Sequence, residues 1–252
     1  MVDTHAHLTD KAFDEDRDEV IKRARETGIN KIICILCEFS DERINIFKKL
    51  LRENFIFGAV GVHPQDAKDY EKNKKTFLEL LELPKIVALG EMGFDYHYMH
   101  SQPEDQKRVF EDQLKIAKEK NLPVIIHSRE ASEDTFALIR DLKPAKAVMH
   151  CFSGDEKEAK AYLDMGFYIS FAGPITFKNA AKAKEVLKII PEEKLLLETD
   201  CPYLSPQAFR GSRNEPSYIK YTFNEAALLR NTEMKKLAQA LERNSAEIFK
   251  TG

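Results

Sequence analysis

The chain has 252 residues, of which 43% are hydrophobic and 32% are charged, and its formal net charge is −3. This composition is typical of a folded globular protein and excludes a disordered chain. The weak negative charge argues against a protein that coats nucleic acid with a basic surface. A local nucleic-acid site in which metal ions supply the positive charge stays open.

The four cysteines of the chain are too few for a disulfide framework. Cys34 and Cys37 lie in an apolar run and are expected to be buried in a strand. The N-terminus lacks the basic and apolar regions of a signal peptide, and no apolar run approaches the ~18 residues of a membrane span. We therefore expect a cytoplasmic protein without membrane association.

Short apolar runs rich in β-branched residues alternate with longer helical patterns along the whole chain. Such runs are typical of parallel strands that are buried on both faces. The expected strands are Met1–His7, Lys31–Cys37, Ile56–His63, Ile86–Glu91, Val124–His127, Ala147–Cys151, Phe167–Ala172 and Leu195–Asp200. The expected helices are Asp14–Gly28, Asp41–Asn54, Gln65–Leu83, Pro103–Asn121, Ala131–Leu142, Asp155–Met165, Lys178–Ile190, Tyr218–Arg230 and Thr232–Phe249.

Eight strand–helix units in about 250 residues predict a closed (β/α)₈ TIM barrel with right-handed crossovers. The barrel is expected to be a single domain over residues 1–252, with an extra C-terminal helix. An open, doubly wound sheet is the competing architecture. No Gly-x-Gly-x-x-Gly motif follows the first strand, which disfavours the dinucleotide-binding version of that sheet.

Histidines and carboxylates gather where the expected strands end, which is where barrel enzymes of this kind have their active sites. His5 and His7 are two residues apart in a strand, so they point to the same face. Five of the seven histidines lie at such strand ends, and the other two, His97 and His100, lie in the loop after the fourth strand. The candidate metal ligands are His5, His7, Glu91, His127, His150 and Asp200.

Histidine and carboxylate ligands together suit Zn, Mn, Fe, Co or Ni, or Mg with more oxygen ligands. Six such side chains are too many for one tetrahedral ion and fit two divalent ions, with Mg, Mn or Zn as candidates. Glu91 can bridge the two, because a carboxylate has two oxygens. Cys151 and Cys201 each follow a candidate ligand, so strand alternation predicts that both thiols point toward the helices.

Six segments carry the most distinctive motifs: Asp3–His7, Gly61–Pro64, Gly90–Tyr96, His150–Gly154, Glu198–Pro202 and Arg210–Pro216. They resemble the signature blocks of the TatD family, a family of metal-dependent deoxyribonucleases in the amidohydrolase superfamily. The resemblance spans the whole chain and implies a (β/α)₈ barrel, a divalent-metal centre and hydrolysis of DNA phosphodiesters, often from the 3′ end. It implies one ion held by His5, His7, Glu91 and Asp200, and another held by Glu91, His127 and His150.

Three residues are expected to act in catalysis. Asp200 would accept the proton of a water that attacks phosphorus, while Glu91 bridges the ions that activate this water. His63 would contact the scissile phosphate or protonate the leaving 3′-oxygen. The alternative for His63 is a turn histidine held by Pro64.

Arg129, Arg210, Arg213 and Asn214 are candidate phosphate contacts, since a guanidinium group binds phosphate through two hydrogen bonds. The alternative is a solvated loop whose arginines pair with Glu215. Tyr203 is a candidate for stacking on an unpaired base, as are Phe94 and Tyr96, although packing explains each ring equally well. The expected partner is DNA, as single strands or 3′ ends, with no obligate protein partner.

Two other functions stay open. The same metal centre polarises carbonyl groups, so the enzyme could hydrolyse an ester, amide or lactone, including an aminoacyl-tRNA ester. A non-enzymatic metal- or nucleic-acid-binding protein is the second alternative, and the complete set of ligands argues against it.

Overall fold

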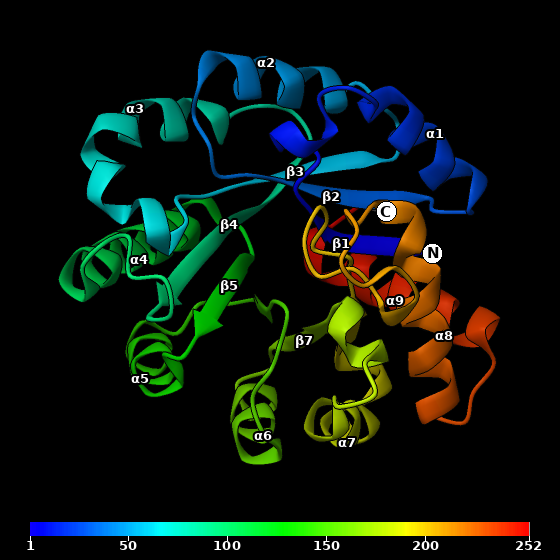
Figure 1. Ribbon diagram of the computed structural model, residues 1–252. Coiled ribbons are helices and arrows are strands. Elements are labelled where there is room, and N and C mark those ends of the chain that lie inside the picture. Colours follow the sequence, from blue (N-terminus) through cyan, green and yellow to red (C-terminus); the bar gives the residue numbers. More distant parts are fainter. Residues whose placement is uncertain (252) are drawn as a thin grey trace.

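The computed structural model describes residues 1–251, and within them eight parallel strands form one sheet in the order β1 to β8. Helices connect the strands and surround the sheet (Figure 1). The strands are β1 (Val2–Ala6), β2 (Lys31–Leu36), β3 (Ile56–Val60), β4 (Ile86–Asp95), β5 (Val124–Arg129), β6 (Ala147–Met149), β7 (Tyr168–Phe171) and β8 (Leu195–Leu197). The α-helices are α1 (Arg17–Glu26), α2 (Asp41–Leu50), α3 (Tyr70–Leu80), α4 (Pro103–Lys120), α5 (Ser132–Leu142), α6 (Glu156–Asp164), α7 (Ala181–Ile189), α8 (Ile219–Leu229) and α9 (Met234–Phe249). The predicted (β/α)₈ TIM barrel with an extra C-terminal helix, α9, is confirmed.

Two ends of the sheet meet at β1 and β8. Ala6 and Cys201 form a parallel bridge. The amide of His7 donates to the carbonyl of Cys201 at 2.8 Å, and the amide of Asp200 donates to the carbonyl of His5 at 2.9 Å. Candidate ligands from the two ends of the chain therefore share one side of the barrel mouth.

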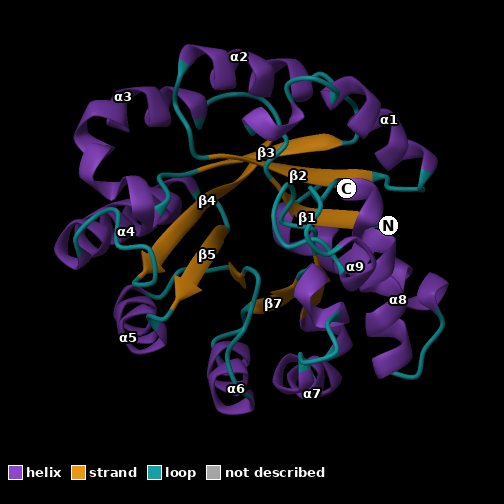
Figure 2. Cartoon of the chain, in the orientation of Figure 1, coloured by secondary structure: helices purple, strands orange, loops and turns teal. Residues whose placement is uncertain are grey.

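Apolar side chains fill both the inside of the barrel and the space between strands and helices. β2 shows the alternation: Ile33 and Ile35 belong to an inner cluster, whereas Ile32, Cys34 and Leu36 belong to the outer one. Because both faces are buried, this strand reads as a continuous apolar run in the sequence. Figure 2 shows the resulting layers, with the strands at the centre and the helices outside.

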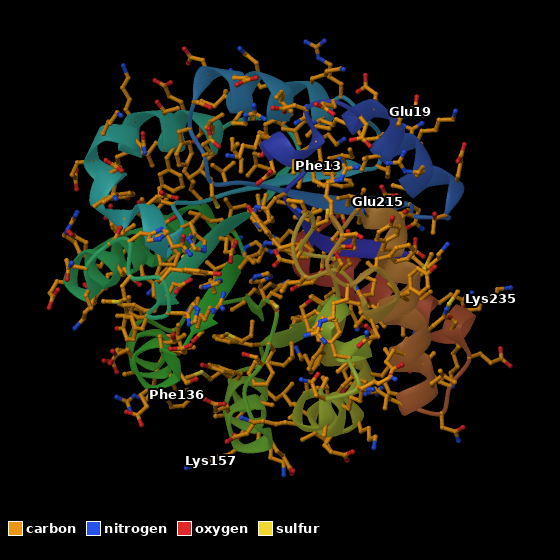
Figure 3. The ribbon with its side chains drawn as sticks, viewed as in Figure 1. Phe13, Glu19, Phe136, Lys157, Glu215 and Lys235 are labelled. Atoms are coloured by element: carbon orange, nitrogen blue, oxygen red, sulfur yellow. The ribbon has the colours of Figure 1, made fainter. Side chains whose placement is uncertain are left out.

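The helices present polar side chains to solvent, and side chains near their ends cap the free backbone groups. α6 begins with a capping box in which the side chain of Asp155 accepts from the amide of Glu158 and the side chain of Glu158 accepts from the amide of Asp155. Lys157 on α6 and Lys235 on α9 point outward from the ring (Figure 3). Within residues 1–251, no helix combines the length and the apolar character that crossing a membrane requires.

Several strand ends differ from the predicted ones. β3, β6 and β8 end before His63, His150 and Asp200, which therefore lie in the loops that follow. β4 continues to Asp95, four residues beyond the predicted end. Gly93 allows this, because a Cβ there would lie 1.9 Å from the carbonyl oxygen of His127 on the paired strand.

The expected helix Gln65–Leu83 is two elements. A 3₁₀ segment, η2 (Pro64–Asp69), precedes α3. The side chain of His63 caps η2 by accepting from the amide of Gln65. This short segment places His63 at the edge of the barrel mouth.

Candidate metal centre

Glu91 lies at the centre of the barrel mouth and is 2% exposed. Its Oε1 lies 2.7 Å from Nδ1 of His127 and 3.2 Å from Nε2 of His150. Its Oε2 lies 3.3 Å from Nε2 of His5 and 3.6 Å from Nε2 of His7. The two oxygens face different pairs of histidines, which is the arrangement that a bridging carboxylate requires.

Asp200 completes the group on the β1 side. Its Oδ1 lies 3.3 Å from Nε2 of His7 and 3.6 Å from Nε2 of His5. The two Nε2 atoms of His5 and His7 lie 3.1 Å apart. Both imidazoles thus face Asp200 across the contact between β1 and β8, as the alternation in the first strand predicted.

These residues fit divalent cations. The ligand atoms of His5, His7 and Asp200 all lie within 4.8 Å of one another, and so do those of Glu91, His127 and His150. Imidazole nitrogens and carboxylate oxygens are the usual ligands of Zn and Mn. The Nδ1 atom of His5 is buried without a hydrogen-bond partner in the described chain. The nitrogen and oxygen atoms that face one another in this largely buried space suit a cation between them.

The charges of the group are mutually dependent. Burial opposes the ionisation of Glu91, but the charge of His150 and the hydrogen bond with His127 hold the pKa of this carboxyl well below its usual range. Burial lowers the pKa of His5, and the neighbouring His150 adds to the effect. Glu91 is therefore an anion at neutral pH, and His5 is neutral, which are the forms that bind metal.

Glu198 supports His150 from behind and was not predicted. Its Oε1 lies 2.8 Å from Nδ1 of His150 and also accepts from the amide of Cys151 at 2.7 Å. Its Oε2 accepts from the hydroxyl of Ser170 at 2.6 Å. The signal in the sequence was the spacing of two residues between Glu198 and Asp200, which places both on the same face of an extended segment.

Asp95 supports His127 in a similar way and was also missed. Its Oδ2 lies 3.3 Å from Nε2 of His127 and accepts from the side chain of Gln65 at 3.1 Å. Asp95 was overlooked because β4 was expected to end at Glu91. The even spacing between these two carboxylates would have placed both on the inner face of a longer strand.

His63 carries its hydrogen on the nitrogen that faces the cluster. Its Nδ1 accepts from the amide of Gln65 at 3.2 Å, so the neutral ring bears its hydrogen on Nε2. Burial lowers the pKa of His63 to about 4, so the ring is neutral at pH 7. Nε2 lies 3.7 Å from Oε1 of Glu91. A nitrogen that bears a hydrogen is a donor and not a metal ligand, which agrees with leaving His63 out of the predicted ligand set.

A cavity of about 1020 Å³ contains this cluster and is bordered by the loops that follow the strands. Six carboxylates line it, against two permanent cations, Arg129 and Lys182. Cys151 also lines it, so the prediction that this thiol points toward the helices is wrong. The reason is that β6 ends at Met149 and Cys151 takes a left-handed φ of 45°, which breaks the alternation. Cys201 belongs to the outer apolar cluster between strands and helices, which agrees with the direction predicted for its thiol.

The family model described as TatD related DNase matches residues 2–250. The chain belongs to the TatD family. It is 42% identical over 254 residues to a Bacillus subtilis (strain 168) protein named uncharacterized metal-dependent hydrolase YabD, with 99% of each chain covered. It is 34% identical over 257 residues to the 3′-5′ ssDNA/RNA exonuclease TatD of Erwinia amylovora, again with 99% of each covered. The crystal structure of YjjV, a TatD homolog from Escherichia coli K12, superposes with a TM-score of 0.89 at 31% identity, covering 99% of this chain and 98% of the other. The protein is thus a metal-dependent hydrolase of the TatD family.

Two of the predicted substrate contacts line the cavity of this TatD-family barrel. Arg129 ends β5, and Tyr203 follows β8. The other predicted aromatic contacts do not line it. Phe94 is 1% exposed and packs in the core, and the hydroxyl of Tyr96 donates to Asp134 at 2.7 Å.

The remaining predicted contacts hold the loop after β8 in place, so we revise their role. Arg213 donates to both carboxylate oxygens of Asp16 at 2.6 and 2.7 Å. Its guanidinium lies 4.9 Å from the ring centre of Phe13. Asn214 is fully buried and donates to the carbonyls of Thr199 and Tyr203 at 2.9 and 2.7 Å. Their polar groups are occupied by the protein itself.

The predicted alternative for this loop is half right. Glu215 pairs with Arg213 of the loop at 4.0 Å, as this alternative expected, and more closely with Arg23 of α1 at 2.7 Å. Figure 3 shows Phe13 and Glu215 on the side of the barrel where α1 lies. Arg210 lies over the ring of Phe177 at 4.7 Å and does not line the cavity. The loop is therefore fastened to α1 through Arg213 and Glu215, while Arg210, Gly211 and Ser212 are exposed.

Proposed function

We propose that this protein is a nuclease that releases nucleotides from the 3′ ends of single-stranded DNA by metal-dependent hydrolysis of phosphodiester bonds. The observation that carries the proposal is the position of Glu91, whose two oxygens face two separate groups of histidines. The name of the Erwinia amylovora relative supports the choice of substrate class. The cavity has the volume of a site for a drug-sized molecule, which admits a nucleotide.

Two divalent ions form part of this proposal, with Mg, Mn or Zn as candidates. One would lie among His5, His7, Glu91 and Asp200, and the other among Glu91, His127 and His150. Ions held there lower the pKa of a water molecule and neutralise charge that develops on a phosphate. The acidic lining of the cavity is a further reason to propose these ions, because without them the negative phosphodiester would be repelled by several carboxylates at close range.

Asp200 is the base of the proposed reaction. Burial opposes its ionisation, but the hydrogen bond with His7 and the charge of His150 hold its pKa below the usual value, so it is an anion at neutral pH. It accepts the proton of the attacking water. The oxygen of that water bonds to phosphorus as the bond from phosphorus to the 3′-oxygen breaks, and the phosphate stays on the released nucleotide.

His63 assists the leaving oxygen. Because its neutral ring bears the hydrogen on Nε2, it donates a hydrogen bond to the 3′-oxygen as negative charge develops there. The 3′-oxygen then takes its proton from solvent water. Of the two roles expected for His63, the hydrogen-bond contact agrees better with a neutral imidazole than proton donation does.

A digestion ladder tests the proposed function. A single-stranded oligonucleotide with a 5′ label is incubated with the purified protein and Mg²⁺, Mn²⁺, Co²⁺ or Zn²⁺. We expect products that shorten one nucleotide at a time from the 3′ end with at least one of these ions. An intact oligonucleotide with all four ions, together with hydrolysis of a carboxylic ester, lactone or aminoacyl ester, would replace the proposal with the ester-hydrolase alternative.

A further inference from the structure

Exposed apolar side chains gather on two loops that border the cavity. Within residues 1–251, seven large hydrophobic side chains are strongly exposed, and four of them belong to the pairs Tyr98–Met99 and Tyr203–Leu204. Tyr98 and Tyr203 are 50% and 52% exposed, and both residues line the cavity. Exposed apolar surface beside a cavity is typical of a surface that a ligand covers.

The two loops share a backbone feature. Met99 and Leu204, which follow the two tyrosines, have left-handed φ values of 52° and 53°. Glycine adopts this conformation readily, but it is uncommon for residues with bulky side chains. Such backbone strain gathers at binding sites. At both positions the chain turns sharply directly after an exposed ring, which keeps that ring at the border of the cavity.

Both residues are anchored before any ligand binds, Tyr98 through its backbone and Tyr203 through its ring. The amide of Tyr98 donates to Oδ1 of Asp95 at 3.0 Å. The hydroxyl of Tyr203 donates to Asp10 at 2.8 Å, and its carbonyl accepts from Asn214 at 2.7 Å. A ring that is ordered in advance loses little conformational entropy when it stacks on a ligand.

The tyrosines lie on opposite sides of the ligand cluster. The ring of Tyr203 is 5.7 Å from the ring of His7, on the β1 side. Tyr98 is fastened to Asp95, which contacts His127 on the β5 side. The guanidinium of Arg129 lies 4.8 Å from the ring centre of Tyr98 and has no carboxylate partner in the described chain. A cation beside an exposed ring suits a base and its phosphate together.

We propose that Tyr98 and Tyr203 are two stacking platforms that hold consecutive unpaired nucleotides, one on each side of the scissile phosphodiester. The assignment of sides rests on the proposed function. The leaving 3′-oxygen belongs to the penultimate nucleotide and faces His63, whose ring is 4.8 Å from that of His127. Tyr98 with Arg129 therefore takes the penultimate nucleotide, and Tyr203 takes the terminal one.

This arrangement defines the substrate class. Stacking tolerates every base, because each base offers an aromatic face. A base within a duplex is stacked on its neighbours and is not free for a tyrosine. The substrate is thus a strand of any sequence in which at least the last two nucleotides at the 3′ end are unpaired.

The test uses the fluorescence of 2-aminopurine, which is quenched when the base stacks. The probe is a single-stranded oligonucleotide whose last linkage is a 3′-methylenephosphonate, which keeps its charge and is not hydrolysed. The base analogue occupies either the terminal or the penultimate position, and the protein is loaded with Mn²⁺. We expect quenching at both positions with the wild type.

Each variant should affect one position. Tyr98→Ala should lose the quenching at the penultimate base alone, and Tyr203→Ala should lose it at the terminal base alone. Tyr98→Phe should retain it, and Tyr221→Ala, on α8 and away from the cavity, serves as the matched control. Unchanged quenching in both alanine variants, or equal loss at both positions in each, would overturn the proposal.

Kinetics on a hydrolysable oligonucleotide separate this inference from the proposed function. Tyr98→Ala should raise KM about ten-fold, the scale of one lost stacking contact. The variant should match the wild type when the penultimate nucleotide is abasic. If the wild type shortens the oligonucleotide and Tyr98→Ala leaves KM unchanged, the proposed stacking role is rejected and the proposed nuclease activity is retained. If the wild type shortens no oligonucleotide and quenches neither position, both proposals fail.

Discussion

The Oε1 oxygen of Glu198 lies 2.8 Å from Nδ1 of His150, while Oε1 of Glu91 lies 3.2 Å from Nε2 on the other side of the ring. A carboxylate on one side of an imidazole fixes the orientation of the ring and makes the other nitrogen a better metal ligand. Glu198 itself is held by the hydroxyl of Ser170. Glu198 thus lies behind a candidate ligand, at the position from which a carboxylate can orient it.

Replacing Glu198 tests this support. Glu198→Gln should weaken Mn²⁺ or Zn²⁺ binding about 10- to 100-fold, the usual effect of losing such a carboxylate. Calorimetric titration of the metal-free protein measures the affinity. Glu193→Gln, at an exposed position just before β8, is the matched control. Equal affinities for the two variants would mean that Glu198 does not position His150.

Metal removal should lower the thermal stability. The buried cluster gathers two carboxylates and several imidazoles, and cations that bind only the folded chain stabilise it. We expect the Tm to fall after chelation and to recover when Mn²⁺ or Zn²⁺ is added back. Glu91→Gln should reduce this recovery. A Tm that does not change with chelator or metal would argue against a metal centre in this cluster.

Two arginines should respond differently to substitution. Arg129 lines the cavity without a carboxylate partner, so Arg129→Ala should weaken binding of single-stranded DNA and reduce the slope of log K against log salt by about 0.7. Arg213 is bound to Asp16, so Arg213→Ala should lower the Tm and leave that slope unchanged. Fluorescence anisotropy of a labelled oligonucleotide at several salt concentrations measures both. The opposite pattern would restore the phosphate-binding role first predicted for Arg213.

The contact between Asp16 and Arg213 should also make the free energy of unfolding depend on pH in the acid range. The hydrogen bond from Arg213 lowers the pKa of Asp16 to about 2, against an ordinary value of 3.8. A lowered pKa stabilises the fold above the ordinary value, and the benefit is lost as the pH falls through the folded value. We expect a loss of about 1 kcal/mol or less between about pH 4 and pH 2, because the pair is partly exposed.

Denaturant unfolding of the wild type and Arg213→Ala across this pH range measures that loss. The variant lacks the interaction, so its free energy of unfolding should fall less steeply with acid than that of the wild type. Parallel curves for the two proteins would show that Asp16 does not contribute in this way.

The sequence predicted the barrel, and it predicted which side chains gather at the barrel mouth, because both depend on local patterns. Apolar runs mark the strands, and histidines directly after them mark the mouth of the barrel. His5, His7 and Asp200 lie together as expected, since a closed barrel makes β1 and β8 neighbours.

What the sequence did not predict depends on contacts between distant segments. The supporting roles of Asp95 and Glu198 follow from where β4 and β8 end, and strand ends are set by pairing with the neighbouring strand. Arg213 and Asn214 looked available for a ligand because the docking of their loop on Asp16 and Thr199 is a tertiary contact. The inward-facing Cys151 results from a left-handed turn that no local pattern announces.

The most direct test of the central claim is the rate of nucleotide release from 3′-labelled single-stranded DNA by Glu91→Gln in saturating Mn²⁺. This substitution keeps the size of the side chain but removes the charge that faces both histidine groups. We predict that the rate falls by about 10²–10³ or more relative to the wild type, as when a group that stabilises the transition state is lost. A folded Glu91→Gln variant that releases nucleotides at nearly the wild-type rate would contradict a shared metal centre at Glu91.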